Sequence, residues 1–321
     1  MADWQIPTLI DILAARGRIR PYVQPTPLRH YPSLSKRIGA EVWVKHENHL
    51  PTGAFKVRGG INLVAQLSDD ERRRGVITAS TGNHGQSIAY AARRAGVRAT
   101  ICVPDGANPV KVQSIADLGA EIVSHGRDFD DAREHCERLA VEHGLRYVHS
   151  GNEPQLIAGV GTHTLEILEE CPDVEVIIVP IGGGSGAAGA CIAAKAVNPE
   201  IRVIGVQSEA APAGYRSWKA GQLVEDRMAT FAEGLATRTA FELPQRILRT
   251  RLDDFILVSD GEIRRAIATM LEYTRNLIEG AGAAPLAAAL TLRSELAGRK
   301  LALIASGGNL SPAQLREVLA I

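Results

Sequence analysis

Residues 47–60, with the sequence ENHLPTGAFKVRGG, carry the most informative pattern in the chain. A strand-like run, Val42–Lys45, precedes them, and an amphipathic segment begins at Phe55, so Lys56 lies where a loop enters the first turn of a helix. A helix N-terminus carries partial positive charge and disfavours a cation. An amine near positive charge loses its proton more easily, and a neutral amine is a nucleophile. A surface lysine with its amine in water is the structural alternative.

The run TGAFKVRG, residues 52–59, resembles the cofactor-lysine motif of the threonine/serine dehydratase family of pyridoxal-phosphate enzymes. This family shares the fold of the tryptophan synthase β chain, known as fold type II, and its lysine binds the cofactor covalently. The resemblance therefore implies that Lys56 is catalytic and that Phe55 and Lys56 contact pyridoxal 5'-phosphate. The family more often has serine where this chain has Ala54, which removes a hydroxyl beside the cofactor.

The composition indicates no nucleic-acid or membrane partner. Lys plus Arg and Asp plus Glu number 36 each in 321 residues, so the formal net charge is zero. No apolar run approaches the roughly 18 residues that a membrane-spanning helix needs. The four cysteines form no CxxC pair and are expected to be reduced thiols. Because the chain starts without a secretory signal pattern, we expect a cytoplasmic protein.

Short, continuous apolar runs alternate with helix-like segments along the chain. Such runs are typical of strands buried on both faces, and the alternation predicts an α/β fold with largely parallel sheets flanked by helices. The predicted strands span residues 41–45, 75–79, 98–103, 120–124, 146–149, 174–181, 201–207, 255–258 and 301–305. Residues 223–252 form the least regular region, which is too long for an ordinary connection.

The turn-like break at Gly151-Asn152 is an expected domain seam. In the resembling family a small domain is inserted in a larger one, and the active site lies between the two. We therefore expect a small domain over residues 52–151 and a large cofactor-binding domain over residues 1–51 and 152–321. Pockets form preferentially at such seams.

A second motif, STGNHGQ at residues 80–86, follows the predicted strand 75–79 and precedes a helix expected from Ser87. A strand-to-helix loop of this composition points backbone N–H groups at an anion, although a plain helix cap is the alternative. The pattern Ser/Thr-x-Gly-Asn-His resembles the substrate-carboxylate loop of the family. By this resemblance Asn83 also reaches the ring hydroxyl of the cofactor. The residues assigned to the substrate carboxylate are Ser80, Thr81, Gly82, Asn83 and His84.

A third motif, GGGSG at residues 182–186, lies between the predicted strand 174–181 and a helix from Ala187. Its glycines let the backbone wrap a phosphate closely, and the helix dipole adds attraction. A tightly packed loop without a ligand is the structural alternative, but consecutive glycines cost conformational entropy. The residues expected to bind the cofactor phosphate are Gly182, Gly183, Gly184, Ser185 and Gly186.

The same stretch has a second functional interpretation. Gly184, Gly186 and Gly189 satisfy the dinucleotide fingerprint GxGxxG, and Glu209 lies 20 residues after Gly189, where a ribose-binding acid is expected. An NAD- or FAD-binding oxidoreductase is therefore a distant alternative. It leaves Lys56 and the motif at residues 80–86 unexplained.

A fourth motif, ASGGN at residues 305–309, follows the predicted strand 301–305 and on its own is no more than a tight turn. In the resembling family the serine at this place, Ser306, hydrogen-bonds the pyridine nitrogen of the cofactor. A hydroxyl does not hold a proton on the ring as a carboxylate would, which favours β-elimination over transamination. Two further segments resemble family segments against the cofactor, and they add Gly234 and Glu279 to the expected cofactor-binding residues.

Some members of the family bind a cation through an acid, a backbone carbonyl four residues on, and a second acid two residues further. Glu209 and Ala213 match the first two positions, but Tyr215 replaces the second acid. A Mg²⁺ or other cation at Glu209 and Ala213 is therefore an open alternative that the departure at Tyr215 weakens.

The resemblance covers nearly the whole chain and implies a pyridoxal-phosphate-dependent ammonia-lyase or dehydratase. The expected reaction is β-elimination of water and ammonia from a β-hydroxy amino acid such as threonine, serine, phenylserine or hydroxyaspartate, to give a 2-oxo acid. Serine racemase-like chemistry and β-replacement stay open as alternatives within the family. We expect a homodimer whose small-molecule ligand is an amino acid.

Overall fold

The computed structural model describes residues 4–320. Residues 1–3 and 321, which the expected large domain includes, lie outside the described residues. The helices are α1 (Leu9–Ile19), α2 (Pro32–Ile38), α3 (Lys56–Val64), α4 (Asp69–Arg74), α5 (Asn83–Ala95), α6 (Pro109–Asp117), α7 (Phe129–Glu142), α8 (Pro154–Glu170), α9 (Ser185–Val197), α10 (Ala213–Ala220), α11 (Glu242–Arg251), α12 (Asp260–Thr274), α13 (Gly280–Thr291) and α14 (Pro312–Leu319). Short 3₁₀ helices are η1 (Glu47–His49) and η2 (Glu233–Leu235). Within residues 4–320, no helix combines the length and the apolar character that a membrane span requires.

The strands form two sheets. They are β1 (Leu28–His30), β2 (Glu41–His46), β3 (Val76–Ala79), β4 (Ala99–Val103), β5 (Glu121–Ser124), β6 (Arg146–Tyr147), β7 (Val176–Pro180), β8 (Arg202–Ser208), β9 (Asp254–Val258) and β10 (Lys300–Ala305). The six-stranded sheet has the order β1-β2-β10-β7-β8-β9, and the four-stranded sheet has the order β5-β4-β3-β6. β1 pairs antiparallel with β2, whereas the other pairings are parallel. The predicted α/β fold with largely parallel sheets is thus confirmed.

Several elements differ from the sequence-based expectation, and α9, expected from Ala187, begins at Ser185. The pattern does not predict β1, which is only three residues long and has a single buried side chain. The helix expected from Ser87 begins at Asn83, so the last four residues of the motif, 83–86, form its first turn. α11 lies inside the region expected to be irregular, and its Pro244 is tolerated because the first turn of a helix has unpaired N–H groups in any case.

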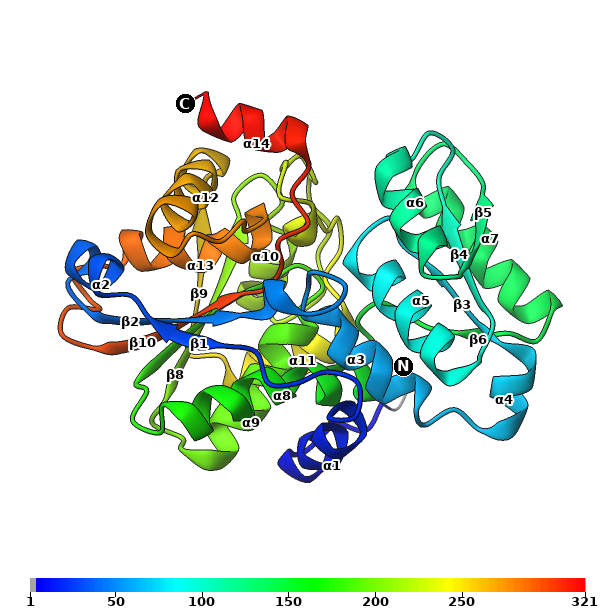
Figure 1. Cartoon of the computed structure of the whole chain (residues 1–321), viewed down its shortest axis with the longest axis horizontal. Helices are drawn as coiled ribbons and strands as arrows, with labels where there is room; N and C mark the ends of the chain where they lie inside the picture. The colour runs from blue at the N-terminus through cyan, green and yellow to red at the C-terminus, as the bar shows by residue number, and fades with distance from the viewer. Residues whose placement is uncertain (1–3, 321) are drawn as a thin grey trace.

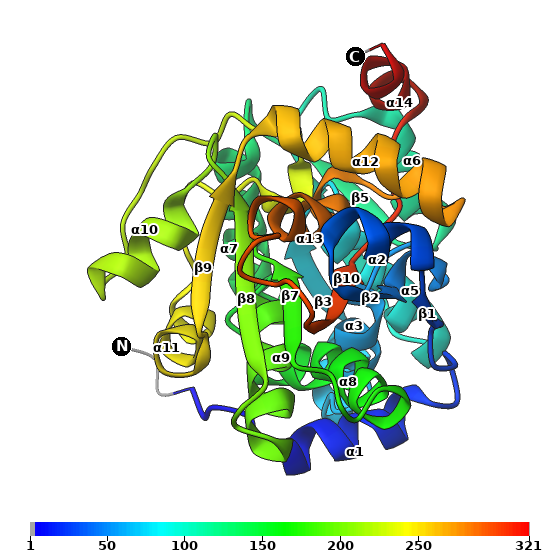
Figure 2. The ribbon, with the colours of Figure 1, turned by 90° about the vertical axis from the view of Figure 1, so that its left-hand side faces the viewer.

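Helices cover both faces of the six-stranded sheet. α12 and α13 lie on one face and α8 and α9 on the other, as Figure 1 and, turned by 90°, Figure 2 show. Successive strand residues point to opposite faces, so Ile178 packs with α12 and α13 while Ile177 packs with α8 and α9. Because both faces are covered, the central strands β7 and β10 are mostly apolar and buried, which accounts for the continuous runs in the sequence.

The four-stranded sheet forms a separate layer with α4, α5, α6 and α7 at the right of Figure 1. All of its strands come from between Val76 and Tyr147, within the residues 52–151 expected for a small domain. The six-stranded sheet takes β1 and β2 from before this segment and β7 to β10 from after it. The domain boundaries themselves stay a prediction.

Close contacts between helix backbones connect the two layers through α3, α8 and α9. A Cβ atom on Gly159 of α8 would lie 2.7 Å from the Cα atom of Gly59 and from the carbonyl oxygen of Arg58, both in α3. A Cβ atom on Gly189 of α9 would lie 2.8 Å from the Cα atom of Gly161 in α8. Any side chain here would push the helices apart.

We expect Gly189→Ala to destabilise the fold by about 1–3 kcal/mol, because backbone atoms cannot move aside as a flexible side chain can. The measurement is urea unfolding followed by circular dichroism. The matched control is Gly17→Ala on the exposed side of α1, where the added Cβ meets nothing within 4 Å. That substitution should instead stabilise by about 0.5–1 kcal/mol. Equal effects of the two substitutions would contradict the packing argument.

Candidate active site

Lys56 is the first residue of α3, as predicted, and its amine faces the start of α9. Its Nζ atom donates hydrogen bonds to the Ser185 hydroxyl at 2.9 Å and to the Ser150 carbonyl at 3.3 Å. The side chain is half-buried, and burial of the amine lowers its pKa to about 8. The amine is therefore much easier to deprotonate than that of an exposed lysine, whose pKa is about 10.4. The lowered pKa is caused by loss of hydration of the buried amine. The sequence pattern instead predicts an effect of neighbouring positive charge.

The glycine loop at residues 182–186 joins β7 to α9, and Ser185 is the first residue of that helix. Gly184 has a φ of +88°, which a residue with a side chain rarely adopts. A Cβ atom on Gly182 would lie 2.1 Å from the carbonyl oxygen of Gly234. The loop thus presents bare backbone at a helix N-terminus, where unpaired N–H groups favour an anion such as phosphate.

Phe55 contacts both the glycine loop and the residue that follows β10. Its ring lies 3.0 Å from where a Cβ atom on Gly186 would be placed. Its backbone N–H donates to the carbonyl oxygen of Ser306 at 2.9 Å. Ser306, which is buried, therefore lies next to the lysine loop although 250 residues separate it from Lys56 in the sequence.

The loop at residues 80–84 follows β3 and leads into α5. The Ser80 hydroxyl accepts hydrogen bonds from the backbone N–H groups of Gly82 and Gly85 at 3.2 and 3.0 Å, so it holds the loop in shape. Thr81, Gly82 and Asn83 are partly exposed at the start of the helix. The Gly82 N–H donates to the Ser80 hydroxyl, but among the described residues no partner accepts from the backbone N–H groups of Thr81 and Asn83, which therefore suit an anionic ligand.

His84 is buried, and its hydrogen bonds define where its proton lies. The Thr78 hydroxyl donates to the Val148 carbonyl at 2.7 Å, so it accepts from His84 Nε2 at 3.0 Å. Burial lowers the pKa of His84 to about 3, which keeps the ring neutral near pH 7. A neutral ring does not balance the charge of a substrate carboxylate, so the backbone N–H groups of the loop are left for that task. The assignment of His84 to the carboxylate stays a prediction.

Glu279 links this loop to the cofactor-binding residues predicted near the C-terminus. Asn83 Nδ2 donates to Glu279 Oε1 at 2.8 Å, and Asn309 Nδ2 donates to Asn83 Oδ1 at 2.7 Å. Burial raises the pKa of Glu279 to about 7, although the hydrogen bond from Asn83 lowers it in part. A Cβ atom on Gly234 would lie 3.9 Å from Glu279 Oε1. The predicted cofactor-binding residues thus lie in one continuous site.

Two residues of the site were not assigned from the sequence. Asn309 lies in the ASGGN motif, where its position after two glycines is the signal that could have identified it. Phe241 precedes α11, and its ring lies 2.4 Å from where a Cβ atom on Gly183 would be placed. Nothing in the sequence marks Phe241, because its contact depends on how the segment before α11 folds back onto the glycine loop.

The residues of the expected cation site do not join this site. The Glu209 carbonyl oxygen accepts from Arg227 Nη2 at 3.2 Å, Ala213 begins α10, and the Tyr215 ring packs edge-on against Phe255. Hard cations need several oxygen ligands, and one exposed carboxylate does not supply them. In the described part of the chain, no group of three or more His, Cys, Asp and Glu side chains could hold a metal ion. We therefore assign no cation here.

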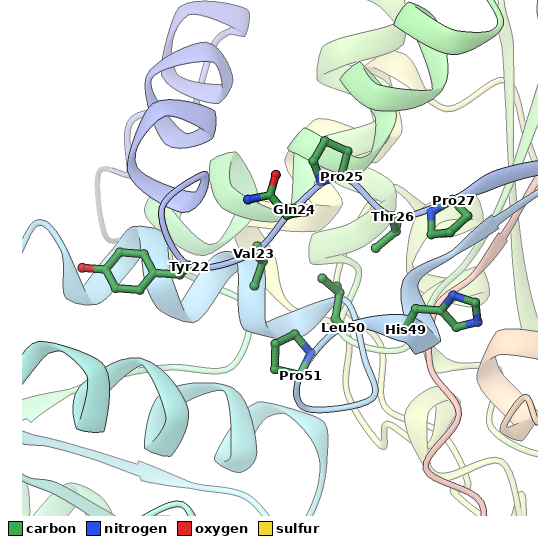
Figure 3. A pocket seen from close by; sticks show the side chains of 9 residues that line it. All are labelled: Tyr22, Val23, Gln24, Pro25, Thr26, Pro27, His49, Leu50 and Pro51. Carbon is green, nitrogen blue, oxygen red and sulfur yellow. The ribbon is translucent and has the colours of Figure 1, made fainter.

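A pocket of about 250 Å³ lies between the segment before β1 and the segment that follows β2 (Figure 3). It is lined by residues 22–27 and 49–51. No residue of the predicted site lines this pocket, so we do not include it in the candidate active site.

Comparison with known proteins identifies the family. A model of the pyridoxal-phosphate dependent enzyme family matches residues 19–307. The chain is 41% identical over 305 residues to an L-threonine ammonia-lyase of Thermotoga maritima, covering 94% of this chain and 76% of that protein. It is 37% identical over 305 residues to an L-threo-3-hydroxyaspartate ammonia-lyase of Saccharomyces cerevisiae, covering 95% and 94%. The processed form of threonine deaminase isoform 2 from Solanum lycopersicum superposes with a TM-score of 0.93 at 32% identity, covering 97% and 91%.

The chain belongs to the family of pyridoxal-phosphate-dependent enzymes, and its structural neighbours have fold type II. The resemblance stated from the sequence is thus confirmed. The oxidoreductase alternative is not supported, because the family model over residues 19–307 and the relatives named above are pyridoxal-phosphate enzymes.

Glu279 should make stability depend on pH. Its folded-state pKa of about 7 lies above its ordinary value of 4.5, so its contribution to stability is present at low pH and lost as pH rises through about 7. Glu279→Gln has no proton to lose. The measurement is the melting temperature of the variant and of the unsubstituted protein, both freed of cofactor. The difference, variant minus unsubstituted protein, should increase from about pH 5 to about pH 8. Glu272→Gln, on the exposed side of α12, is the control and should show a constant difference.

Proposed function

We propose that this protein is a pyridoxal-phosphate-dependent ammonia-lyase that removes water and ammonia from a β-hydroxy amino acid to give a 2-oxo acid. The observation that carries the proposal is the Lys56 amine, which is poised near neutrality by burial and directed at the start of α9. The relatives named as threonine and hydroxyaspartate ammonia-lyases support the substrate class.

The residues present fit the cofactor. The backbone of Gly182, Gly183, Gly184, Ser185 and Gly186 would hold its phosphate at the N-terminus of α9. Phe55, Asn83, Gly234, Glu279 and Ser306 would surround its ring. Pyridoxal phosphate, when bound, supplies an aldehyde that bonds to amines and a conjugated ring that takes up the electron pair left at Cα.

Lys56 has two tasks in this proposal. As a neutral amine it would hold the cofactor, and the same amine, when free, would serve as the general base for the proton at Cα. The backbone N–H groups of Thr81, Asn83 and His84 would hold the substrate carboxylate, which would fix Cα relative to Lys56. Ser306 offers a neutral hydroxyl to the ring nitrogen, and this favours loss of the β-hydroxyl over transfer of the amino group.

We further infer a small domain over residues 52–151, a large domain over the remainder, and a cytoplasmic homodimer. The smaller sheet lies wholly within residues 52–151, which supports the division. Cys102, Cys136, Cys171 and Cys191 are free and buried, as suits a reducing compartment. The homodimer is inferred from the family resemblance, and light scattering of the purified protein measures it directly.

The proposal is tested by the visible absorption of the purified protein with pyridoxal phosphate, followed by titration with four amino acids. They are L-threonine, L-serine, threo-3-hydroxyaspartate and threo-phenylserine. We expect a visible band that shifts with at least one of them, together with release of its 2-oxo acid and ammonia in equal amounts. A band that shifts with formation only of the opposite enantiomer, or of a β-substituted product, would replace the lyase assignment by racemisation or β-replacement.

Lys56→Ala should lose turnover by a factor of at least about 10³, because both the bond to the cofactor and the base at Cα depend on the amine. The measurement is 2-oxo acid formation under saturating substrate, with circular dichroism to show that the variant is folded. Lys36→Ala, which removes an exposed lysine of α2, is the matched control and should keep full activity. Normal steady-state activity of the Lys56 variant would refute the assignment.

A further inference from the structure

Behind Lys56 lies a fully buried group of charged and hydroxyl side chains, which we name the Arg58 cluster. It consists of Thr26, Lys45, Glu47, Arg58, Thr162 and Glu166. Arg58 belongs to the first turn of α3, two residues after Lys56. Its side chain is 1% exposed, and those of Lys45 and Glu47 are 0% exposed.

The Arg58 guanidinium is held between two carboxylates. Nε and Nη2 donate to Glu47 at 2.7 and 2.8 Å, and Nη1 and Nη2 donate to Glu166 at 2.6 and 2.8 Å. The remaining Nη1 donor reaches the Thr162 hydroxyl at 3.2 Å. Both pairs are bidentate, so the planar guanidinium has one permitted orientation.

A second layer holds the carboxylates in place. The Thr26 hydroxyl donates to Glu47 at 2.6 Å, and Lys45 Nζ donates to Glu166 at 2.7 Å and to the Thr26 carbonyl at 2.6 Å. The two cations and two carboxylates leave no net charge. Burial alone would raise the pKa of Glu47, but the Arg58 guanidinium holds it well below its ordinary range, so the pair stays ionised.

The cluster ties the start of α3 to three separate parts of the fold. Glu47 comes from η1, Glu166 from α8, and Thr26 from the segment before β1. A local cap could have ordered this turn, yet Phe55 at the N-cap makes no side-chain capping hydrogen bond. The cluster therefore supplies from a distance the restraint that a capping side chain usually supplies.

Stability alone does not explain these charges. A buried ion pair often stabilises a fold no better than apolar side chains of similar volume, because desolvation offsets the attraction. What a doubly bidentate arginine adds is a unique orientation for the element that carries it.

We propose that Arg58 is a positioning residue for the reaction: by clamping the first turn of α3 between Glu47 and Glu166, it sets the place from which the Lys56 amine reaches Ser185 and the substrate Cα. This inference rests on the proposed function of Lys56. The clamp affects the position of the Lys56 amine and not its pKa, because the pKa is lowered by burial of the amine. The Ser87 hydroxyl adds a restraint from the other side, as it donates to the Lys56 carbonyl at 2.6 Å.

The test compares Arg58→Lys with Arg146→Lys in the holoenzyme. Arg146 on β6 also bridges two glutamates, Glu153 at 2.7 Å and Glu71 at 3.3 Å, but it does not belong to α3. Lysine keeps the charge in both variants and loses the bidentate geometry. The readouts are kcat and KM, the melting temperature, the visible spectrum of the bound cofactor, and hydrogen exchange of the segment 55–64.

For Arg58→Lys we expect kcat to fall about 10- to 100-fold, because a displacement of about 1 Å at a catalytic group costs this much. KM should stay within about threefold, since the amine acts in the transition state and does not bind substrate. Hydrogen exchange in the segment 55–64 should accelerate about tenfold, with no change in α9. Arg146→Lys should lose comparable thermal stability while its kcat and the exchange of α3 are unchanged.

The inference would be overturned if Arg58→Lys lowers the melting temperature but leaves kcat and the hydrogen exchange of α3 unchanged. The role of Arg58 would then be structural only. If the unsubstituted protein shows no visible band with pyridoxal phosphate, the proposed function fails, which is a different result.

If Arg58→Lys does not fold, the double variant Lys45→Met with Glu166→Gln replaces it. This variant keeps the charge balance of Arg58 and Glu47 and removes one half of the clamp. It should show the same fall in kcat, and unchanged kcat would equally overturn the inference.

Discussion

Direct contact between helix backbones is the constraint on which the site depends. α3, α8 and α9 approach so closely that a Cβ atom on Gly159 or Gly189 would clash with the backbone of the neighbouring helix. These contacts connect the element that carries Lys56 to the element whose N-terminus carries the glycine loop. Because the helices cannot slide without a clash, the distance from the Lys56 amine to Ser185 follows from helix packing and not from the loops alone.

Four helix N-termini meet at the site, and this arrangement explains its chemistry. α3 begins at Lys56, α5 at Asn83, α9 at Ser185, and α13 directly after Glu279. Their dipoles and unpaired N–H groups make the region favourable for a phosphate and a carboxylate. The lowered pKa of the Lys56 amine, about 8, has a separate cause, which is burial of the amine.

Charge is buried in two different ways around Lys56. In the Arg58 cluster each ion has a partner of opposite charge at hydrogen-bond distance, so the ions persist. At Lys56, His84 and Glu279 burial favours the neutral form instead. Groups that orient the site therefore remain charged, whereas Lys56 and Glu279 can exchange protons near neutral pH and His84 stays neutral.

The sequence by itself determined the α/β class, the nearly parallel strands and the four motifs, because each depends on local chemistry: apolar runs, glycines and the residues that precede a helix. It also placed Lys56 at the start of a helix. Only the tertiary structure decided that Asn309 bonds Asn83, that Phe241 covers Gly183, and that Arg58 is clamped between Glu47 and Glu166. These contacts join residues up to 226 positions apart. No local pattern encodes them, because they exist only when the two sheets and the helices between them are packed together.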